Sequence, residues 1–331
     1  MRSLHLRLPI ATTVAAAGLL ASGPSTAALF VGDLFYTTYS GSPNVFKVAY
    51  SYDDVAHSFG LAAPTSVASV GGADGIIFGT NGNLLVGGQG TGNVYEVNPT
   101  SGATVATQAT GAPSYHLTLD PSGTKVYTSD FGGALKTLGT PIGSGVTTTG
   151  ITGSEGGVTQ IAFGTGGAVF YVNGAPNGGG NVGTINLGTG ATSRLNSSVL
   201  PAHGIVYDPF SDVMTLFGAG HTGRFSAADG SGLKTSVAAF SCDFDQGAVD
   251  GKGHALVAGC GGITLIDYSV SGDITAPDYF SFIGGFGAID DLAPLVGAGS
   301  APPPTGTPEP GSLALAGLAL AGLVGSRRRR H

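Results

Sequence analysis

Residues 74–97 read DGIIFGTNGNLLVGGQGTGNVYEV, and this stretch decides the fold. Three short apolar runs are separated by turns rich in Gly and Asn, and a further run begins at Thr104. Gly and Asp supply the positive φ angles that tight hairpins need. The stretch therefore predicts a small antiparallel sheet of three or four strands.

The same pattern occurs five times along the chain. The units begin at Asp74, Tyr115, Thr159, His203 and Asp245, and the starts are separated by 41, 44, 44 and 42 residues. Four antiparallel strands in about 40 to 45 residues are typical of one propeller blade. A sandwich does not repeat in this way.

Both ends of the repeat region are incomplete units. A lone strand begins at Asp290, and the segment from residue 29 to Asp74 contains strands that lack a first member. Together they make a sixth blade, which closes the ring and removes free sheet edges. The sequence predicts an all-β, six-bladed β-propeller over residues 29–296. A seventh blade would require a degenerate unit in residues 137–157, and the even spacing argues against it.

Composition agrees with an all-β body and argues against nucleic acid as a partner. The 331 residues include 59 Gly, which disfavours a helix bundle. Between residues 28 and 300 there are seven Lys or Arg and nineteen Asp or Glu, a net charge near −12. Such a surface repels phosphate backbones.

Residues 1–28 are predicted to be a signal peptide with a helical apolar core. Arg2 and Arg7 precede an uncharged stretch over residues 8–21, and small residues follow at positions 25–28. This order is typical of a secretion signal. The alternative is a buried N-terminal helix.

The unit from Asp74 to Val97 resembles the units of six-bladed propellers of the NHL, SMP-30/gluconolactonase and virginiamycin B lyase type. The resemblance covers about residues 29–296 and implies the same ring architecture. Lactonase-type propellers use a metal ion that polarises a carbonyl and activates water, so the resemblance to them also implies such an ion.

The C-terminal region divides into a linker and a short hydrophobic segment. Residues 297–310 are rich in Pro, Gly, Ser and Thr, which predicts an extended linker. Residues 311–331 contain a run of thirteen uncharged residues, Leu313–Gly325. As a short helix this run spans roughly 20 Å, less than the ~30 Å bilayer core. It is predicted to act as a membrane anchor, with the basic end at the cytoplasmic face.

Pro308, Glu309 and Pro310, with the terminal cluster Arg327, Arg328, Arg329 and Arg330, are similar to the PEP-CTERM sorting signal of Gram-negative bacteria. The resemblance implies export across the inner membrane, a transient membrane anchor and processing by an exosortase-like membrane enzyme. The body would then reach the cell surface, the exopolysaccharide or the medium. The alternatives are a simple tail anchor and a solvated basic tail.

Aligning the units predicts a column of residues where each inner strand enters the central channel. The predicted binding residues at this channel mouth are Asp74, Tyr115, His116, His203, Asp245 and Asp290. Of these, Asp74, His203, Asp245 and Asp290 are candidate metal ligands, because oxygen ligands with one imidazole suit Ca²⁺, Mn²⁺ or Zn²⁺. The alternative is that these residues are polar only because the mouth of a channel is exposed to water. No catalytic residue and no cofactor beyond this divalent metal ion is assigned.

Cys242 and Cys260 flank the predicted first hairpin of the last complete unit, with its turn at residues 250–253. In an oxidising compartment they are predicted to form a disulfide. By closing the loop between them, this bond would stabilise the folded protein by about 3 kcal/mol. The alternative is a pair of buried thiols.

The sequence therefore favours an exported surface or extracellular-matrix propeller that is noncatalytic and acts by binding or as a structural protein. Its predicted partners are the exosortase-like enzyme and an exopolysaccharide or small ligand. The alternative is a metal-dependent lactonase-like or lyase-like enzyme that uses the central channel.

Overall fold

The computed structural model describes residues 28–302, except 154, 156, 176–178, 197–201 and 237–243. The predicted signal peptide, apart from residue 28, and the predicted sorting segment lie outside the described residues. Cys242 does so too.

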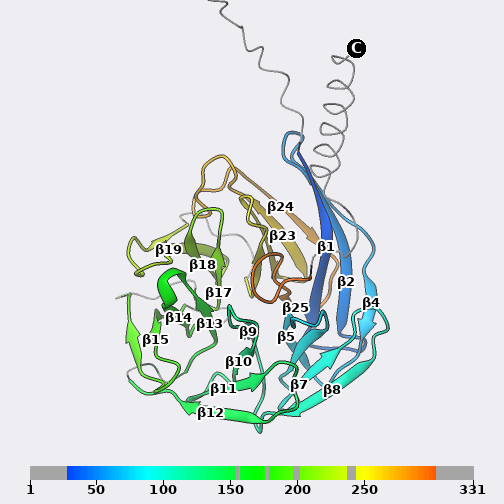
Figure 1. Ribbon diagram of the computed structural model, residues 1–331. Coiled ribbons are helices and arrows are strands. Elements are labelled where there is room, and N and C mark those ends of the chain that lie inside the picture. The colour runs from blue at the N-terminus through cyan, green and yellow to red at the C-terminus, as the bar shows by residue number, and fades with distance from the viewer. Residues whose placement is uncertain are drawn as a thin grey trace, which may run out of the picture.

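Six antiparallel sheets surround a common axis (Figure 1). Blade 1 contains β5 (Ala73–Phe78), β6 (Leu84–Gly88), β7 (Asn93–Val97) and β8 (Thr104–Ala109). Blade 2 contains β9 (Leu117–Leu119), β10 (Lys125–Ser129), β11 (Ala134–Gly139) and β12 (Val146–Gly150). Blade 3 contains β13 (Gln160–Phe163), the 3-10 helix η1 (Thr165–Gly167), β14 (Val169–Val172), β15 (Val182–Ile185) and β16 (Thr192–Arg194).

The remaining blades complete the ring. Blade 4 contains β17 (Gly204–Asp208), β18 (Val213–Gly218), β19 (His221–Ser226) and β20 (Lys234–Thr235). Blade 5 contains β21 (Gly247–Val249), β22 (His254–Gly259), β23 (Gly262–Asp267) and β24 (Tyr279–Gly284). The closing blade contains β25 (Ile289–Leu292), β1 (Leu29–Thr38), β2 (Val45–Asp53), β3 (Ser58–Leu61) and β4 (Thr65–Ala68). The predicted six-bladed propeller is confirmed.

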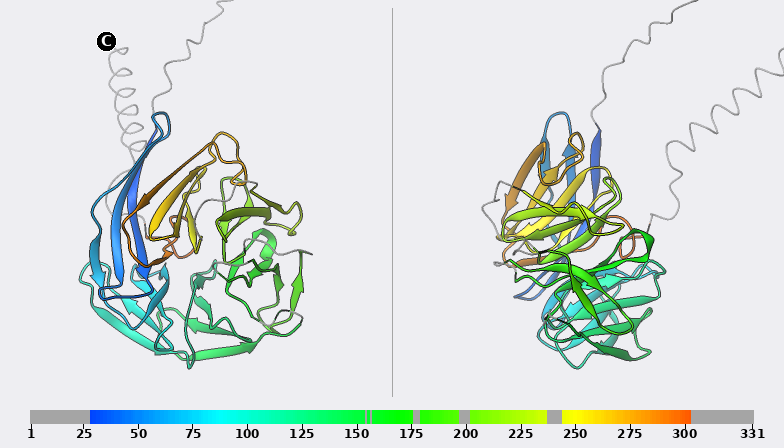
Figure 2. Two further views of the ribbon diagram at one scale, coloured as in Figure 1. Left: turned by 180° about the vertical axis from the view of Figure 1, so that it is seen from behind. Right: turned by 90° about the vertical axis from the view of Figure 1, so that its left-hand side faces the viewer.

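Strands from both ends of the repeat region close the ring. β25 pairs with β1, with Leu292 opposite Tyr36 and Ile289 opposite Thr38. β3 and β4 both pair with β2 and together take the place of the outer strand. Each of the inner strands β5, β9, β13, β17, β21 and β25 contacts the next, and β25 contacts β5. Figure 2 shows the ring from behind and from the side, with parts of β1 and β2 extending beyond the rim of the other blades.

Apolar side chains between neighbouring blades form the core. In one cluster, Phe170 of blade 3 packs against Phe225 of blade 4 with ring centroids 5.0 Å apart in an edge-on arrangement. Both rings are buried, and burial of each such side chain contributes about 1.5–3 kcal/mol. Successive side chains of a strand point to opposite faces of its sheet, so they enter the cores on either side of each blade. The inner strands themselves surround the channel.

Glycine allows the inner strands to approach one another at the start of β5 and β17. A Cβ atom added at Gly75 would lie 2.5 Å from the carbonyl oxygen of Tyr115, and one added at Gly204 would lie 2.6 Å from that of Asp245. No side chain fits at these two positions without movement of the adjacent backbone. The neighbouring blades are therefore in close contact at the channel wall.

Candidate functional site

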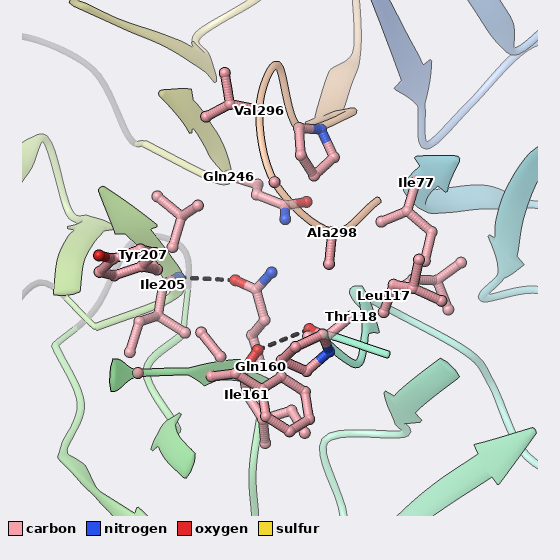
Figure 3. Close-up of a pocket in the computed structure, with 18 of the residues that line it drawn as sticks. Ile77, Leu117, Thr118, Gln160, Ile161, Ile205, Tyr207, Gln246, Val296 and Ala298 are labelled. Atoms are coloured by element: carbon pink, nitrogen blue, oxygen red, sulfur yellow. Dashed lines mark hydrogen bonds between the residues drawn. The ribbon is translucent and has the colours of Figure 1, made fainter. Parts of the chain in front are cut away.

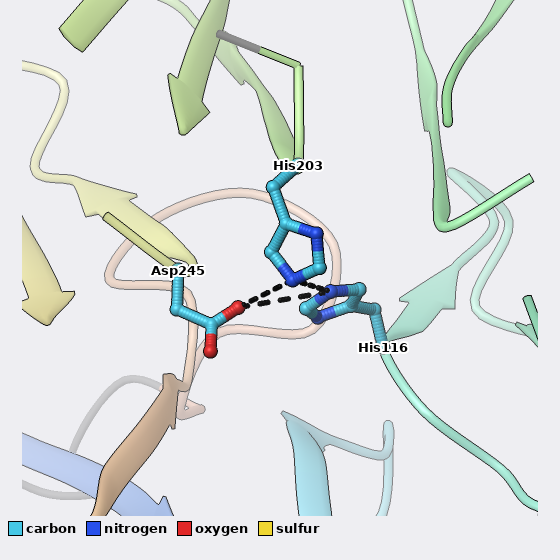
Figure 4. Close-up of side chains that lie close together, drawn as sticks. All are labelled: His116, His203 and Asp245. Carbon is cyan, nitrogen blue, oxygen red and sulfur yellow. Dashed lines mark hydrogen bonds and ion pairs between the residues drawn. The ribbon is translucent and has the colours of Figure 1, made fainter. Parts of the chain in front are cut away.

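The entry positions of three blades converge inside the channel. His116 precedes β9, His203 precedes β17 and Asp245 precedes β21, and their side chains point toward one another (Figure 4). Nε2 of His203 lies 2.7 Å from Oδ1 of Asp245 and 3.1 Å from Nε2 of His116. Nε2 of His116 lies 3.9 Å from the same Asp245 oxygen. We call these three residues, with Asp74, Asp290 and Asp291, the histidine–aspartate cluster.

The second ring nitrogen of each histidine is committed to another acceptor. Nδ1 of His203 donates to the carbonyl oxygen of Gly174 at 2.7 Å, and Nδ1 of His116 lies 2.8 Å from Oδ2 of Asp291. A backbone carbonyl can only accept, so the proton of a neutral His203 resides on Nδ1. Both Nε2 atoms are thereby aimed at Asp245.

Two amides connect this cluster to the rest of the channel. With its amide nitrogen facing the carboxylate, Gln246 donates to both oxygens of Asp291 at 3.1 and 2.9 Å, and its oxygen accepts from Gln160 at 2.6 Å. The Gln160 oxygen in turn accepts from the backbone N–H of Ile205 at 2.7 Å. The result is a hydrogen-bonded belt across four blades.

Burial and neighbouring charges give the residues of the cluster different pKa values. Burial raises the pKa of Asp74 to about 7, with a further contribution from Asp291. Burial would also raise the pKa of Asp245, but the nearby His203 and His116 lower it to about 2. Burial together with Asp74 and Asp245 raises the pKa of Asp290 well above its ordinary value, and burial raises that of Asp291 as well.

The carboxylates around His116 make it more basic than an ordinary histidine. Burial lowers its pKa, but the surrounding carboxylates, above all Asp291, outweigh this effect and raise it to about 10. The cluster combines two imidazoles with four carboxyl groups in a nearly closed space.

The structure brings together five of the six predicted channel residues: Asp74, His116, His203, Asp245 and Asp290. The sixth, Tyr115, stacks on Phe131 with centroids 4.0 Å apart, and its pKa is raised by burial and by nearby carboxylates that include Asp74 and Asp290. Phe131 in turn lies 5.7 Å from the His116 ring and 5.8 Å from the His203 ring, so it covers both imidazoles.

The prediction overlooked Asp291, Gln160 and Gln246. They occupy the position after the predicted column, where two other blades carry Gly75 and Gly204. The predicted His116 comes from this same second position, and nominating its other polar residues as well would have included them. Phe131 follows β10 and has no counterpart in the column, so no repeat signal indicated it.

Two sets of three side chains in the described part of the chain could hold a metal ion. One is His116, His203 and Asp245, and the other is Asp74, His116 and Asp291. Of the predicted ligands, His203 and Asp245 belong to the first set and Asp74 to the second. Asp290 belongs to neither, although it is buried and its Oδ2 has no hydrogen-bond partner among the described residues.

A cavity of about 550 Å³ occupies the other part of the channel (Figure 3). Its walls are mainly apolar side chains of the inner strands, among them Ile77, Leu117, Ile161 and Ile205. Gln160 and Gln246 also line the cavity, so the belt joins it to the histidine–aspartate cluster.

The chain that follows the closing strand also borders this cavity. Pro294, Val296 and Ala298 are among its lining residues. The carbonyl oxygen of Gly299 accepts a hydrogen bond from the N–H of Phe78 at 2.7 Å, which ties this segment to blade 1. We call residues 294–299 the strap.

Cys260 lies in the turn between β22 and β23 and is disulfide-bonded. Because Cys242 lies outside the described residues, the Cys242–Cys260 pair stays a prediction. The turn predicted at residues 250–253 is confirmed, since β21 ends at Val249 and β22 begins at His254.

The sequence beyond the strap carries the decisive similarity. Residues 307–330 match the PEP-CTERM protein-sorting motif. The motif includes Pro308, Glu309, Pro310 and the arginine cluster Arg327–Arg330, and it marks an exported protein that an exosortase, a membrane enzyme, processes. The predicted sorting signal is thus confirmed, while its structure lies outside the described residues. No helix in residues 28–302, as far as they are described, is long and apolar enough to cross a membrane.

Comparison with solved structures supports the propeller fold. The chain is similar to one in the crystal structure of a nidogen/laminin complex, with a TM-score of 0.58 and 11% identity over 80% of this chain and 98% of that chain. It is also similar to a catalytically inactive virginiamycin B lyase from Staphylococcus aureus with quinupristin. That match has a TM-score of 0.51 and 9% identity over 78% of this chain and 89% of that chain. At such identities the likeness shows the fold alone. No curated protein matches the chain.

Proposed function

We propose that this protein is a noncatalytic cell-surface or extracellular-matrix propeller that binds a small, largely apolar molecule in its channel. The observation that carries the proposal is the cavity between the inner strands and the strap. Its volume of about 550 Å³ lies within the range of small-molecule sites, roughly 300–1,000 Å³. The apolar walls favour a small ligand over an exopolysaccharide chain, whose hydroxyl groups would lose hydrogen bonds to water there.

A few polar groups give such a ligand an orientation. One N–H of the Gln160 amide donates to Gln246, and a primary amide has a second N–H. This second N–H can donate to a carbonyl or ether oxygen of the ligand. The expected ligand is therefore an uncharged molecule with an apolar body and one or two oxygen acceptors.

Filling the cavity tests this proposal. Ala298→Trp places a large side chain at a cavity-lining position, and Ala56→Trp places the same side chain on an exposed turn between β2 and β3. We expect the uncharged fluorescent probe Nile red to bind the wild-type protein and Ala56→Trp with one-to-one stoichiometry. Ala298→Trp should bind it at least about tenfold more weakly, a loss of about 1.4 kcal/mol. Equal binding by both variants would refute the cavity as the binding site.

Catalysis by the histidine–aspartate cluster is the second candidate. It is favoured by two neighbouring carboxyl groups with well separated pKa values, about 7 for Asp74 and about 2 for Asp245, which is the arrangement of an acid–base pair. Turnover of lactones that is lost in Asp245→Asn but kept in Ala298→Trp would support the enzyme. Absence of turnover in the wild-type protein would leave the binding function.

A further inference from the structure

We propose that Nε2 of His116, Nε2 of His203 and Oδ1 of Asp245 form a site for one divalent transition-metal ion, with Zn²⁺ as the best fit. The site lies in the histidine–aspartate cluster, beyond the belt from the apolar cavity. It does not depend on the ligand proposed for that cavity.

The distances between the three atoms suit a small ion. They are 2.7, 3.1 and 3.9 Å. A tetrahedral zinc ion with ligands at about 2.0–2.2 Å places its ligand atoms roughly 3.3 Å apart. The three atoms come from blades 2, 4 and 5, so the closed ring itself assembles the site.

Hydrogen bonds orient both imidazoles as metal-binding histidines are usually oriented. Such histidines donate their other ring N–H to a backbone carbonyl or a carboxylate. Here Nδ1 of His203 donates to Gly174, and Nδ1 of His116 faces Asp291. A neutral imidazole oriented in this way presents a bare Nε2 atom, and both Nε2 atoms face the oxygen of Asp245.

Protons alone do not satisfy all three contacts. Two Nε2–H groups cannot point at each other across 3.1 Å, so at most one of these nitrogens carries a proton along that line. A proton on Nε2 of His203 can serve Asp245 or His116, but one N–H cannot be directed at both. A single cation contacts all three atoms at once.

The surroundings also favour a cation, because they are rich in carboxyl oxygens. Asp74, Asp245, Asp290 and Asp291 place four carboxyl groups around two imidazoles, and Oδ2 of Asp290 has no hydrogen-bond partner in the described part of the chain. The other candidate set, which contains Asp74, includes the His116–Asp291 pair. One proton on Nδ1 satisfies that pair at 2.8 Å, so it needs no metal ion.

The ligand types select the metal. Two imidazoles and one carboxylate suit zinc and other first-row divalent ions, whereas Ca²⁺ and Mg²⁺ prefer oxygen ligands throughout. The Asp245 side chain is 15% exposed and the histidines 2%, so an ion would enter from the Asp245 side. Three protein ligands leave a fourth position open for a water molecule or an exogenous ligand.

Metal titration of the full, tag-free protein after EDTA treatment and dialysis tests the site. We expect one Zn²⁺ per chain by elemental analysis, and one Co²⁺ that gives the intense visible absorption of four-coordinate cobalt. His203→Gln and Asp245→Asn should each weaken Zn²⁺ binding by about 100-fold or more, beyond the 10–100-fold typical of residues that only orient a ligand.

His254→Gln is the matched control. His254 is another buried histidine paired with an aspartate, Asp250 at 2.7 Å, but it lies in blade 5 outside the cluster. This variant should bind Zn²⁺ like the wild-type protein, and circular dichroism should show that all variants are folded. The proposal is overturned if the folded wild-type protein binds no Zn²⁺, or if His203→Gln and His254→Gln bind it equally. Neither result would bear on the binding of the fluorescent probe in the cavity.

Discussion

Neighbouring groups set the ionisation of each aspartate in this protein. Asp245 and Asp74 occupy the same position in their repeats, yet the pKa of the first is about 2 and that of the second about 7. Desolvation raises the pKa of both, but His203 and His116 outweigh it at Asp245, whereas at Asp74 the effect of Asp291 adds to it and exceeds the opposite effect of His116. The repeat determines the position of a carboxyl group, and residues from the other blades determine its pKa.

An ion pair outside the channel gives a pH-dependent prediction. Asp273 accepts from both Nε and Nη2 of Arg224 at 2.6 and 2.8 Å, and from the Thr275 hydroxyl at 2.7 Å. Burial would raise the pKa of Asp273, but these hydrogen bonds lower it below its ordinary value. The stabilisation is therefore present above the unfolded-state pKa, near 3.9, and is lost as the pH falls through the lower folded-state pKa.

Asp273→Asn should reduce the free energy of unfolding by about 1–2 kcal/mol at pH 7. The difference between variant and wild type should stay constant down to about pH 5 and shrink below about pH 4. Urea unfolding at several pH values measures it. Asp33→Asn is the control, because the Asp33–Lys47 pair is 49% and 37% exposed and should contribute less than about 1 kcal/mol. A pH-independent loss in Asp273→Asn would contradict the electrostatic explanation.

At this scale the sequence located most of the cluster but could not define it. His203 and Asp245 were found because the repeats place them at one position, and repeat positions converge in a ring. The interaction of His116 with Asp291 and the role of Gly174 were not predictable, because they join residues 175 and 29 positions apart through side-chain directions that no local pattern encodes.

The inner strands are the elements whose packing the site depends on most. Near their starts, β5 and β17 carry Gly75 and Gly204 at the position where two other blades carry His116 and Asp291. A side chain at every blade would overfill the channel wall. The two glycines leave room for the backbone of the next blade, at His116 for Gly75 and at Asp245 for Gly204.

Gly75→Ala should destabilise the protein by about 1–3 kcal/mol, because the added methyl group would lie within 2.7 Å of the backbone at Tyr115, His116 and Leu117. Gly133→Ala, whose added methyl group meets no atom within 4 Å, is the matched control and should change stability little. Thermal unfolding of the two variants makes the comparison. Equal melting temperatures would show that the blades can separate at this point without cost.

The strands themselves were predictable from spacing and turn residues, and the strap was not. Residues 294–299 have the Pro and Gly content of a linker, and the linker was predicted to begin at residue 297. The segment packs against the ring instead: Gly299 accepts a hydrogen bond from Phe78, and Val296 packs against the apolar cluster of blades 4 and 5. Because the cavity depends on this long-range packing, the repeat pattern does not predict it.

For the whole molecule, the ring and the sorting motif occupy separate parts of the chain. The described fold ends with the strap and Pro302, and the motif begins at residue 307. The ring was predictable because its closure follows from two incomplete units, and the motif because it is a local pattern. Every described strand and both parts of the channel are formed by residues that precede the motif.

We therefore expect the extracellular protein to lack residues from near Pro310 onward and to melt at the same temperature as the unprocessed chain. Mass spectrometry of the protein from the medium and from membranes measures the first, and calorimetry of both forms measures the second. Replacing Pro308, Glu309 and Pro310 with alanine should leave the chain unprocessed and retained with the membranes, since the motif that the membrane enzyme recognises would be lost. An intact Arg327–Arg330 cluster in the wild-type extracellular form would contradict processing at this motif. A lower melting temperature after processing would show that the tail contributes to the stability of the ring.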